Sequence, residues 1–303
     1  MKLLGLDLVR STEDAALAAS AWIGSGDKLK ADKAATEAMR NRLNKTEFAG
    51  QIVIGEGKKD ESYGLYCGER VGNVDCTKPL DIAVDPIEGT RPTVTSGPEA
   101  MSTIAMAESN CMFNTEEYYM NKLAYGVSIA KTVELNINDP IENTIKLASL
   151  ANGKKITDIM VCILDRPRHA EVVERMRKMG VRIKLIQDCD VSGAIAACLP
   201  DTGIDLLYGV GGAPEAILTA CAVKCLGGGF QAQLADKNGK VIDNKVYDQN
   251  DLVKGHCVFA ATGITDGSLL KGVRFSEFGP VTNSVFMRSE SGTVRWLTSS
   301  HGN

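Results

Sequence analysis

The chain has 303 residues, and its 34 Lys and Arg residues against 38 Asp and Glu residues give a formal net charge of -4. This length can bury a substantial core, in one large α/β domain or in two packed halves. A slightly acidic chain has no general attraction for nucleic acid or anionic membranes, so we expect neither partner. The sequence shows no secretory signal and no apolar run long enough to cross a bilayer, which favours a soluble, cytoplasmic protein.

The nine cysteines are scattered through apolar segments and show no C-x-x-C spacing. An odd number without such spacing argues against both a disulfide framework and a zinc site. We therefore expect reduced thiols. Cys221 and Cys225 are one helical turn apart on an apolar stretch, where packing is the expected role.

Two helices are predicted at the start of the chain. The first covers Ala15 to Ile23, with an alternative start near Leu3, and it ends at the Gly24-Ser25-Gly26 segment. The second carries an apolar stripe with a spacing of four residues at Ala35, Met39 and Leu43, and Asp32 lies near its N-terminal turn.

Two strands that follow these helices end in carboxylates. Residues 51–54 run into Gly55-Glu56-Gly57, and residues 81–90 read Asp-Ile-Ala-Val-Asp-Pro-Ile-Glu-Gly-Thr. In the second of these segments Pro86 is expected to end the strand, and Gly89 allows the backbone to approach a ligand closely. Asp85 and Glu88 could share a hard cation such as Mg²⁺ or Mn²⁺, although a surface turn would use the same residues.

The rest of the first half should add strands near 102–107, 123–129 and 132–137, mostly with antiparallel pairing. From Asp139 onward helices and strands alternate regularly, which predicts βαβ units and a largely parallel sheet. The expected ranges are 141–151, 167–179, 191–198 and 214–226 for helices, and 156–164, 181–186 and 204–208 for strands. Residues 230–301 should form strands around one short helix at 249–254.

Charged or glycine-rich groups follow three of the predicted parallel strands. They are Asp165-Arg166-Pro167-Arg168-His169, then Asp188-Cys189-Asp190, then the segment from Gly209 to Glu215. Ligands of such sheets bind at the carboxyl ends of the strands, so these groups are candidates for a binding site. An arginine pair suits phosphate, and glycines before Pro214 suit a helix N-terminus that faces an anion, although an exposed helix start and a tight turn are the plain alternatives.

A set of carboxylates completes the candidates. If they converged without cations they would repel each other, so some would have to bind a proton or a metal. Individually, each is more often a solvated surface acid. The set consists of Asp32, Glu56, Asp85, Glu88 and Glu215.

Five groups of motifs occur in order along the chain: Gly26-Asp27-Lys28 with Ala31-Asp32, Val53 to Gly57 with Asp60-Glu61, Asp81 to Arg91, Arg166 to His169, and Tyr208 to Glu215. Together they resemble one known family, the class II fructose-1,6-bisphosphatases of the GlpX type. The resemblance covers nearly the whole chain, and that family belongs with the lithium-sensitive sugar and inositol phosphatases. It implies a layered α/β/α/β/α sandwich, with a mixed sheet in residues 1–138 and the largely parallel sheet in residues 139–303, packed as one compact unit.

The resemblance also implies roles for individual residues. The five carboxylates would hold Mg²⁺ or Mn²⁺, and Lys28 and Asp60 would be needed for activity. The Glu88-Gly89-Thr90 turn would contact the reacting phosphate, with Thr90 orienting the attacking water. The remaining contacts, to the distal phosphate and the sugar, would come from Tyr119, Arg166, Pro167, Arg168, Asp188, Cys189, Asp190 and Gly212.

Two positions depart from the family pattern. Lys58 stands where the family commonly has an acidic residue, which affects the expected number of metals, and Cys189 stands where the family usually has glycine. A buried, inert thiol is favoured at Cys189 over a redox-sensitive one.

The carboxylate set and the resemblance to this family together imply a metal-dependent enzyme of gluconeogenesis that hydrolyses the C1 phosphate of fructose 1,6-bisphosphate and leaves fructose 6-phosphate. Dual activity on sedoheptulose 1,7-bisphosphate is the close alternative. A non-catalytic sugar-phosphate sensor, in which Lys58 occupies a metal site, is a more distant one. We expect a homo-oligomer, a dimer or a tetramer, since symmetric assemblies are common among soluble enzymes.

Overall fold

The computed structural model describes residues 4–57, 63–115 and 119–302. It forms two compact units, residues 1–114 with 253–303 (unit 1) and residues 115–252 (unit 2). The boundary between the two halves predicted from the sequence lies between residues 138 and 139. The units divide the chain elsewhere because residues 119–125 pair within the sheet of unit 2, while residues 257–300 add strands to the sheet of unit 1.

Unit 1 is built on a sheet that is eight-stranded in the described residues, in the order β12-β13-β11-β4-β3-β1-β2, with β14 paired to β13. Its pairing is antiparallel except between β1 and β3, which confirms the mixed, mostly antiparallel sheet. The strands are β1 (Gly50–Ile54), β2 (Arg70–Val71), β3 (Leu80–Glu88), β4 (Met101–Ala107), β11 (Cys257–Gly263), β12 (Arg274–Ser276), β13 (Gly279–Arg288) and β14 (Thr293–Ser300).

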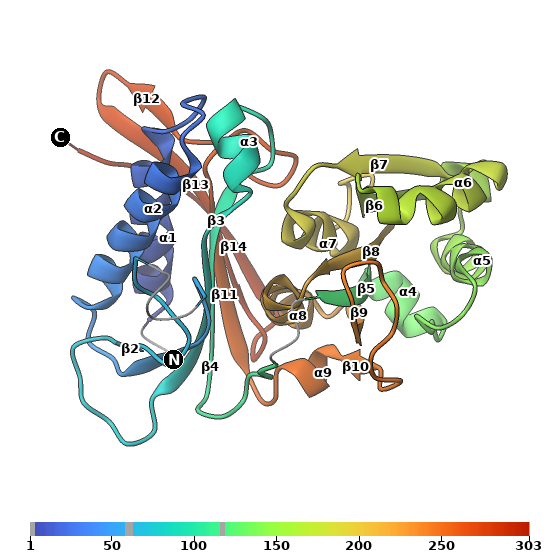
Figure 1. The fold of residues 1–303 in the computed structure, drawn as a ribbon, viewed down its shortest axis with the longest axis horizontal. Helices are drawn as coiled ribbons and strands as arrows, with labels where there is room; N and C mark the ends of the chain where they lie inside the picture. Colours follow the sequence, from blue (N-terminus) through green and yellow to red (C-terminus); the bar gives the residue numbers. More distant parts are fainter. Residues whose placement is uncertain (1–3, 58–62, 116–118, 303) are drawn as a thin grey trace. The chain divides into compact units, whose positions relative to one another are not determined.

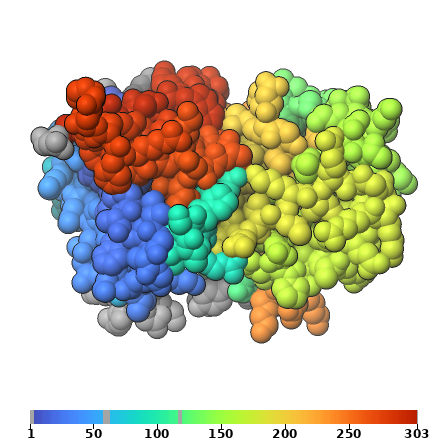
Figure 2. Space-filling model, turned by 90° about the horizontal axis from the view of Figure 1, so that it is seen from above, coloured from blue at the N-terminus to red at the C-terminus, as the bar shows by residue number. Residues whose placement is uncertain are grey.

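Helices α1 (Gly5–Ser20) and α2 (Lys28–Leu43) pack together on this sheet, and the short α3 (Thr90–Thr95) follows β3 (Figure 1). The start of α1 agrees with the earlier of the two predicted starts. Because α1 contacts β11 and β13, the first and last segments of the chain lie side by side, blue and red in Figure 2. Thr12 on α1 is buried and bonds across to Thr262 on β11, with 2.7 Å between the hydroxyl oxygens.

The strand expected to end at Pro86 continues to Glu88. Pro86 lies within an irregularity of β3, where the pairing with β4 shifts register between Asp85 and Glu88. A bulge leaves a residue without a partner in the ladder, so the missing N–H of proline costs nothing there. The expectation that Pro86 stops the strand was therefore wrong, but the irregularity puts Asp85 and Glu88 at the end of β3.

Unit 2 has a six-stranded sheet in the described residues, in the order β10-β9-β5-β8-β6-β7. The βαβ series gives the parallel pairs β6–β7 and β6–β8 as predicted. Antiparallel β5, β9 and β10 extend the same sheet, so it is mixed. The strands are β5 (Tyr119–Tyr125), β6 (Met160–Leu164), β7 (Arg182–Ile186), β8 (Leu206–Gly212), β9 (Gly229–Ala235) and β10 (Tyr247–Asp248).

Helices cover both faces of this second sheet (Figure 1). On one face lie α7 (Asp190–Cys198) and α8 (Ala213–Leu226). On the other lie α4 (Val127–Thr132), α5 (Ile141–Asn152) and α6 (Ala170–Lys178), whose apolar side chains share one core with β5, β6 and β8. Unit 1 is thus a helix layer on a sheet, and unit 2 is a sheet between two helix layers. The last helix, α9 (Gln249–Leu252), follows β10.

One predicted strand is absent from unit 2. Residues 132–137, expected to be a strand, form the end of α4 and an irregular segment. Leu135 and Ile137 are nevertheless buried in the core. The backbone of both is bonded by the side chain of Gln231, which accepts from Ile137 N at 2.7 Å and donates to Leu135 O at 2.5 Å. A side chain therefore satisfies the backbone that a neighbouring strand would otherwise pair.

Candidate active site

In unit 1, the ends of β1 and β3 and the first turns of α2 carry four of the five predicted metal ligands, and the start of α3 carries Thr90. Asp32 and Thr90, from α2 and α3, meet: the Thr90 hydroxyl donates to Asp32 Oδ1 at 2.9 Å. Burial raises the pKa of Asp32, while this hydrogen bond and the charge of Lys28 lower it. Two predicted catalytic residues, Lys28 and Thr90, thus act on the same predicted metal ligand.

Asp85 and Glu88 lie at the irregular end of β3, where Ile87 N donates to Asp85 Oδ1 at 3.1 Å and Glu88 is buried. Gly89 follows with φ 96° and precedes α3. This left-handed conformation suits glycine, which has no Cβ to clash, so the turn that leads to Thr90 depends on that residue. Thr93 closes it by donating its hydroxyl to Gly89 O at 2.9 Å.

Glu56 lies in the loop after β1, next to Gly55. A Cβ at position 55 would lie 2.0 Å from Leu65 O, the same oxygen that accepts from Glu56 N at 3.0 Å. Gly55 therefore permits the close contact that fixes the backbone of Glu56. Asp60 and Lys58 lie outside the described residues.

In unit 2, the predicted phosphate-binding residues come together after β6. The guanidinium of Arg168 lies 5.7 Å from the Tyr119 ring centre and donates from NH2 to Val210 O at 2.7 Å. Its Nε is buried and has no hydrogen-bond partner among the described residues. Burial and the charge of Arg166 lower the pKa of Arg168. Two neighbouring guanidinium groups that repel each other, one of them with an unused donor, have the chemistry that an anion-binding site requires.

Arg166 and the Asp188 to Asp190 turn complete this strand end. Pro167 begins the single helical turn Pro167–His169, and Arg166 just before it binds Asp188, with NH2 2.5 Å from Oδ1. Cys189 is buried and has φ 71°. This backbone conformation favours glycine, which explains why glycine would fit at this position. The burial agrees with the expectation of an inert thiol, and none of the nine cysteines forms a disulfide within the described residues.

His169, the last residue of the charged group after β6, has a structural role. It is 3% exposed; its Nδ1 donates to Leu164 O at 2.7 Å and its Nε2 accepts from Val210 N at 2.8 Å. This arrangement requires the neutral ring, and burial lowers the pKa of His169. Gly209 has φ 131°, and a Cβ there would lie 2.9 Å from His169 Nε2, so the glycine makes room for the ring.

Glu215, the fifth predicted metal ligand, lies in the first turn of α8 in unit 2, and the other four lie in unit 1. Its Oε2 is buried, with no hydrogen-bond partner among the described residues, and lies 1.9 Å from where a Cβ at Gly212 would be. Burial raises its pKa, which the charge of Lys122 opposes and that of Asp190 reinforces. A buried carboxylate oxygen without a donor fits a metal ligand, and oxygen donors suit hard cations.

Within the described residues, no group of three or more His, Cys, Asp or Glu side chains is placed to hold a metal ion. The metal set that the sequence predicts thus stays a prediction. Lys122 was not among the residues predicted from the sequence; it is a buried lysine on β5 whose Nζ lies 2.6 Å from Asp190 Oδ2. A charged residue next to the apolar run that predicts this strand was the available signal.

The similarity to known proteins extends over nearly the whole chain. Residues 2–301 match the family described as bacterial fructose-1,6-bisphosphatase, glpX-encoded. The chain belongs to this family. Membership of the glpX-encoded fructose-1,6-bisphosphatase family confirms the resemblance read from the sequence, and it implies a metal-dependent phosphatase.

Three curated relatives match this glpX-type chain over nearly their full lengths. The fructose-1,6-bisphosphatase class 2 of Haemophilus influenzae is 38% identical, over 98% of this chain and 96% of the relative. A D-fructose 1,6-bisphosphatase class 2/sedoheptulose 1,7-bisphosphatase of Microcystis aeruginosa is 37% identical, over 98% and 96%. The protein of the same description from Thermosynechococcus vestitus is also 37% identical, over 98% and 95%.

Proposed function

We propose that this protein hydrolyses the C1 phosphate of fructose 1,6-bisphosphate, releasing phosphate and fructose 6-phosphate. The match to the glpX-encoded family over residues 2–301 carries this conclusion. We assign the enzyme to gluconeogenesis in the cytoplasm and expect a dimer or a tetramer. No helix in the part of the chain that the structure describes has the length and apolarity to span a membrane.

The proposed metal ligands are Asp32, Glu56, Asp85, Glu88 and Glu215. Bound Mg²⁺ or Mn²⁺ would neutralise phosphate charge and lower the pKa of a coordinated water. The chain itself supplies a proton path: Thr90 donates its hydroxyl hydrogen to Asp32 Oδ1. Its oxygen is therefore an acceptor, which orients the attacking water and passes a proton toward Asp32 as the oxygen–phosphorus bond forms. Lys28 adds positive charge beside this pair, and Asp60 is assigned by resemblance.

The second phosphate and the sugar are assigned to unit 2. Arg166, Arg168 and Tyr119 would hold the distal phosphate, with Pro167 fixing the spacing of the two arginines. Asp188, Asp190 and the backbone at Cys189 and Gly212 would bind the sugar. Since these groups bind parts of the substrate that do not react, their loss should raise KM more than it lowers kcat.

The test is phosphate release from fructose 1,6-bisphosphate with Mg²⁺ or Mn²⁺, with Asp85→Asn as the comparison. We expect the variant to lose at least about a hundredfold in kcat, because a proposed metal ligand becomes neutral. Wild-type rates in that variant would contradict the mechanism. Tight bisphosphate binding by the wild type without any phosphate release would instead support a sensor.

A second candidate is dual activity on sedoheptulose 1,7-bisphosphate. It is favoured by two relatives whose names give both activities, each at 37% identity. Turnover of both bisphosphates by the same preparation decides it. A kcat/KM for the seven-carbon substrate within about tenfold of that for the six-carbon one, a difference of about 1.4 kcal/mol, supports dual activity.

A further inference from the structure

Lys122 is a charged residue in the core of unit 2 that the proposed function does not use. It lies on β5 with 1% of its surface exposed, and its Nζ is 2.6 Å from Asp190 Oδ2. A buried ammonium is costly unless a charge of opposite sign compensates it. The negative charge of Asp190 therefore compensates the buried ammonium. Lys122 comes from the antiparallel strand β5 and lies near the carboxyl end of the parallel strands.

The glycines at the end of β8 make the space for this pair. A Cβ at Gly211 would lie 1.9 Å from Asp190 Oδ2 and 2.8 Å from Lys122 Nζ. A Cβ at Gly212 would lie 1.9 Å from Glu215 Oε2. Asp190 therefore lies against Gly211, and Glu215 lies against Gly212, the next residue of the chain.

Only one of these carboxylates is paired with the lysine. Lys122 binds Asp190, and the buried Oε2 of Glu215 has no hydrogen-bond partner among the described residues. One internal cation next to two carboxylates leaves one negative charge for an external cation to balance. The position of Lys122 thus decides which of the two is left for a metal.

We propose that Lys122 is a positioning residue that serves as a built-in cation for Asp190. It fixes the Asp190 carboxylate for the sugar and keeps it out of the metal set, which leaves Glu215 as the metal-binding carboxylate of unit 2. This inference rests on the proposed function for the sugar contact. Whether the metal binds Glu215 and not Asp190 can be tested by a binding measurement that does not depend on catalysis.

The experiment compares Lys122→Met with Lys154→Met in the full-length protein. Lys154 makes an ion pair of similar length, 2.7 Å from Nζ to Asp205 Oδ1, at the amino end of the same strands, and its side chain is 41% exposed against 1% for Lys122. It is therefore a control for the loss of a lysine ion pair away from the proposed sugar contacts. For Lys122→Met we expect KM for fructose 1,6-bisphosphate to rise about tenfold, with a much smaller change in kcat. The control should keep both values.

The second measurement is Mn²⁺ binding without substrate, followed by electron paramagnetic resonance of the free ion. Lys122→Met should bind Mn²⁺ about tenfold more tightly or with one more ion per chain, because Asp190 is then uncompensated. Adding Asp190→Asn should restore wild-type Mn²⁺ binding. An unchanged KM or unchanged Mn²⁺ binding in Lys122→Met would overturn the inference.

If Lys122→Met does not fold, Asp190→Asn and the double variant decide the matter. Asp190→Asn alone releases the lysine charge beside Glu215, so Mn²⁺ binding should weaken about tenfold, and the double variant should recover it. Equal Mn²⁺ affinity in Asp190→Asn and wild type overturns the proposal. A wild type without phosphatase activity would refute the proposed function instead, and the Mn²⁺ titrations would still test the role of Lys122.

Discussion

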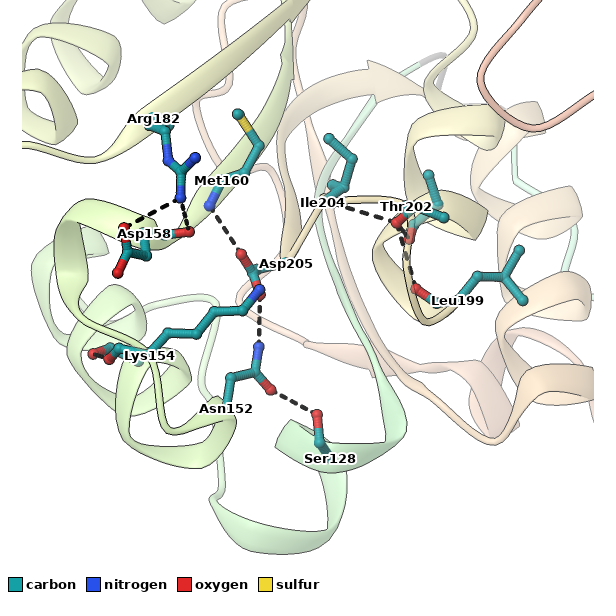
Figure 3. Close-up of polar contacts among 12 residues, drawn as sticks. Ser128, Asn152, Lys154, Asp158, Met160, Arg182, Leu199, Thr202, Ile204 and Asp205 are labelled. Carbon is teal, nitrogen blue, oxygen red and sulfur yellow. Dashed lines mark hydrogen bonds and ion pairs between the residues drawn. The ribbon is translucent and has the colours of Figure 1, made fainter.

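The two ends of the parallel strands in unit 2 place buried carboxylates in opposite situations. At the amino end Asp205 is 4% exposed, and Asn152 and Lys154 each donate to its Oδ1 at 2.7 Å (Figure 3). Its Oδ2 accepts from Met160 N at 3.0 Å. At the carboxyl end the buried Oε2 of Glu215 and Nε of Arg168 have no hydrogen-bond partner among the described residues.

This difference separates groups that stabilise the fold from groups available to a ligand. Asn152, which also accepts from the Ser128 hydroxyl at 2.6 Å, joins Asp205 to the end of α5 and to α4. Both carboxylate oxygens of Asp205 are satisfied by the chain itself, so the network contributes to stability. The buried polar atoms at the other end, which lack partners in the part of the chain that the structure describes, are what a site for a metal and an anion requires.

The largest expected effect is at the carboxyl end. Glu215→Gln should lower the rate of phosphate release about a thousandfold, because the isosteric amide cannot supply the negative charge that a metal needs. In metal-free buffer the same change should leave the free energy of unfolding unchanged or raise it, since a buried charge is removed. Phosphate assays and urea unfolding with chelator measure the two quantities.

A stability loss of more than about 2 kcal/mol in Glu215→Gln, measured by urea unfolding without metal, would contradict the distinction between the two ends. Glu142→Gln is a suitable control for the activity assay. That carboxylate is bound by Arg175 on neighbouring helices, with Oε2 2.6 Å from NH2, away from the proposed substrate groups.

The opposite result is expected at the amino end. Asp205→Asn should lower the free energy of unfolding by about 3 kcal/mol, because Lys154 loses its charged partner and the hydrogen bonds are rearranged. KM and kcat should change less than twofold at a temperature where the variant is folded. Urea unfolding and steady-state kinetics test this; a large KM change with wild-type stability would reverse the comparison.

A smaller effect should appear in the pH dependence of the free energy of unfolding. The buried ring of His169 is hydrogen-bonded to Leu164 and Val210 at the carboxyl end of the strands. Burial puts its folded-state pKa below the ordinary 6.5, so the unfolded chain takes up the proton first as the pH falls. This contribution to stability is therefore complete above pH 6.5 and is lost as the pH falls toward the folded-state pKa.

As the pH falls from 7.5 to 5.5 the free energy of unfolding should decrease, and the His169→Gln variant should lack this decrease. Unfolding curves of both proteins at several pH values provide the measurement. Identical pH profiles would show that the ring does not have to stay neutral in the folded chain.

Much of the fold could be predicted because its signals are local. The alternation after Asp139 correctly predicted β6, α6, β7, α7, β8 and α8, and helical spacing predicted α2. Residues 132–137 misled because apolar alternation is also produced by a buried irregular segment, whose backbone is bonded by Gln231. Gln231, the residue that makes this arrangement possible, lies almost a hundred residues further along the chain.

The candidate site was predictable in part for the same reason. Glycine, proline and charged residues at strand ends marked Asp85, Arg168 and Glu215 as candidates. Lys122 was not recognised, because its role depends on a pairing between β5 and β8 that joins residues far apart in the chain. Nor did the sequence show that Asp32 and Thr90 meet.

By itself, therefore, the sequence determined the types of element, the groups at the ends of the strands and the family, since these follow from neighbouring residues and their order. Only the tertiary structure decided that residues 253–303 return to unit 1, and that Lys122 pairs with Asp190 rather than Glu215. Charge pairing in a buried site depends on distances of a few ångströms between distant segments, and no local pattern in the sequence records those distances.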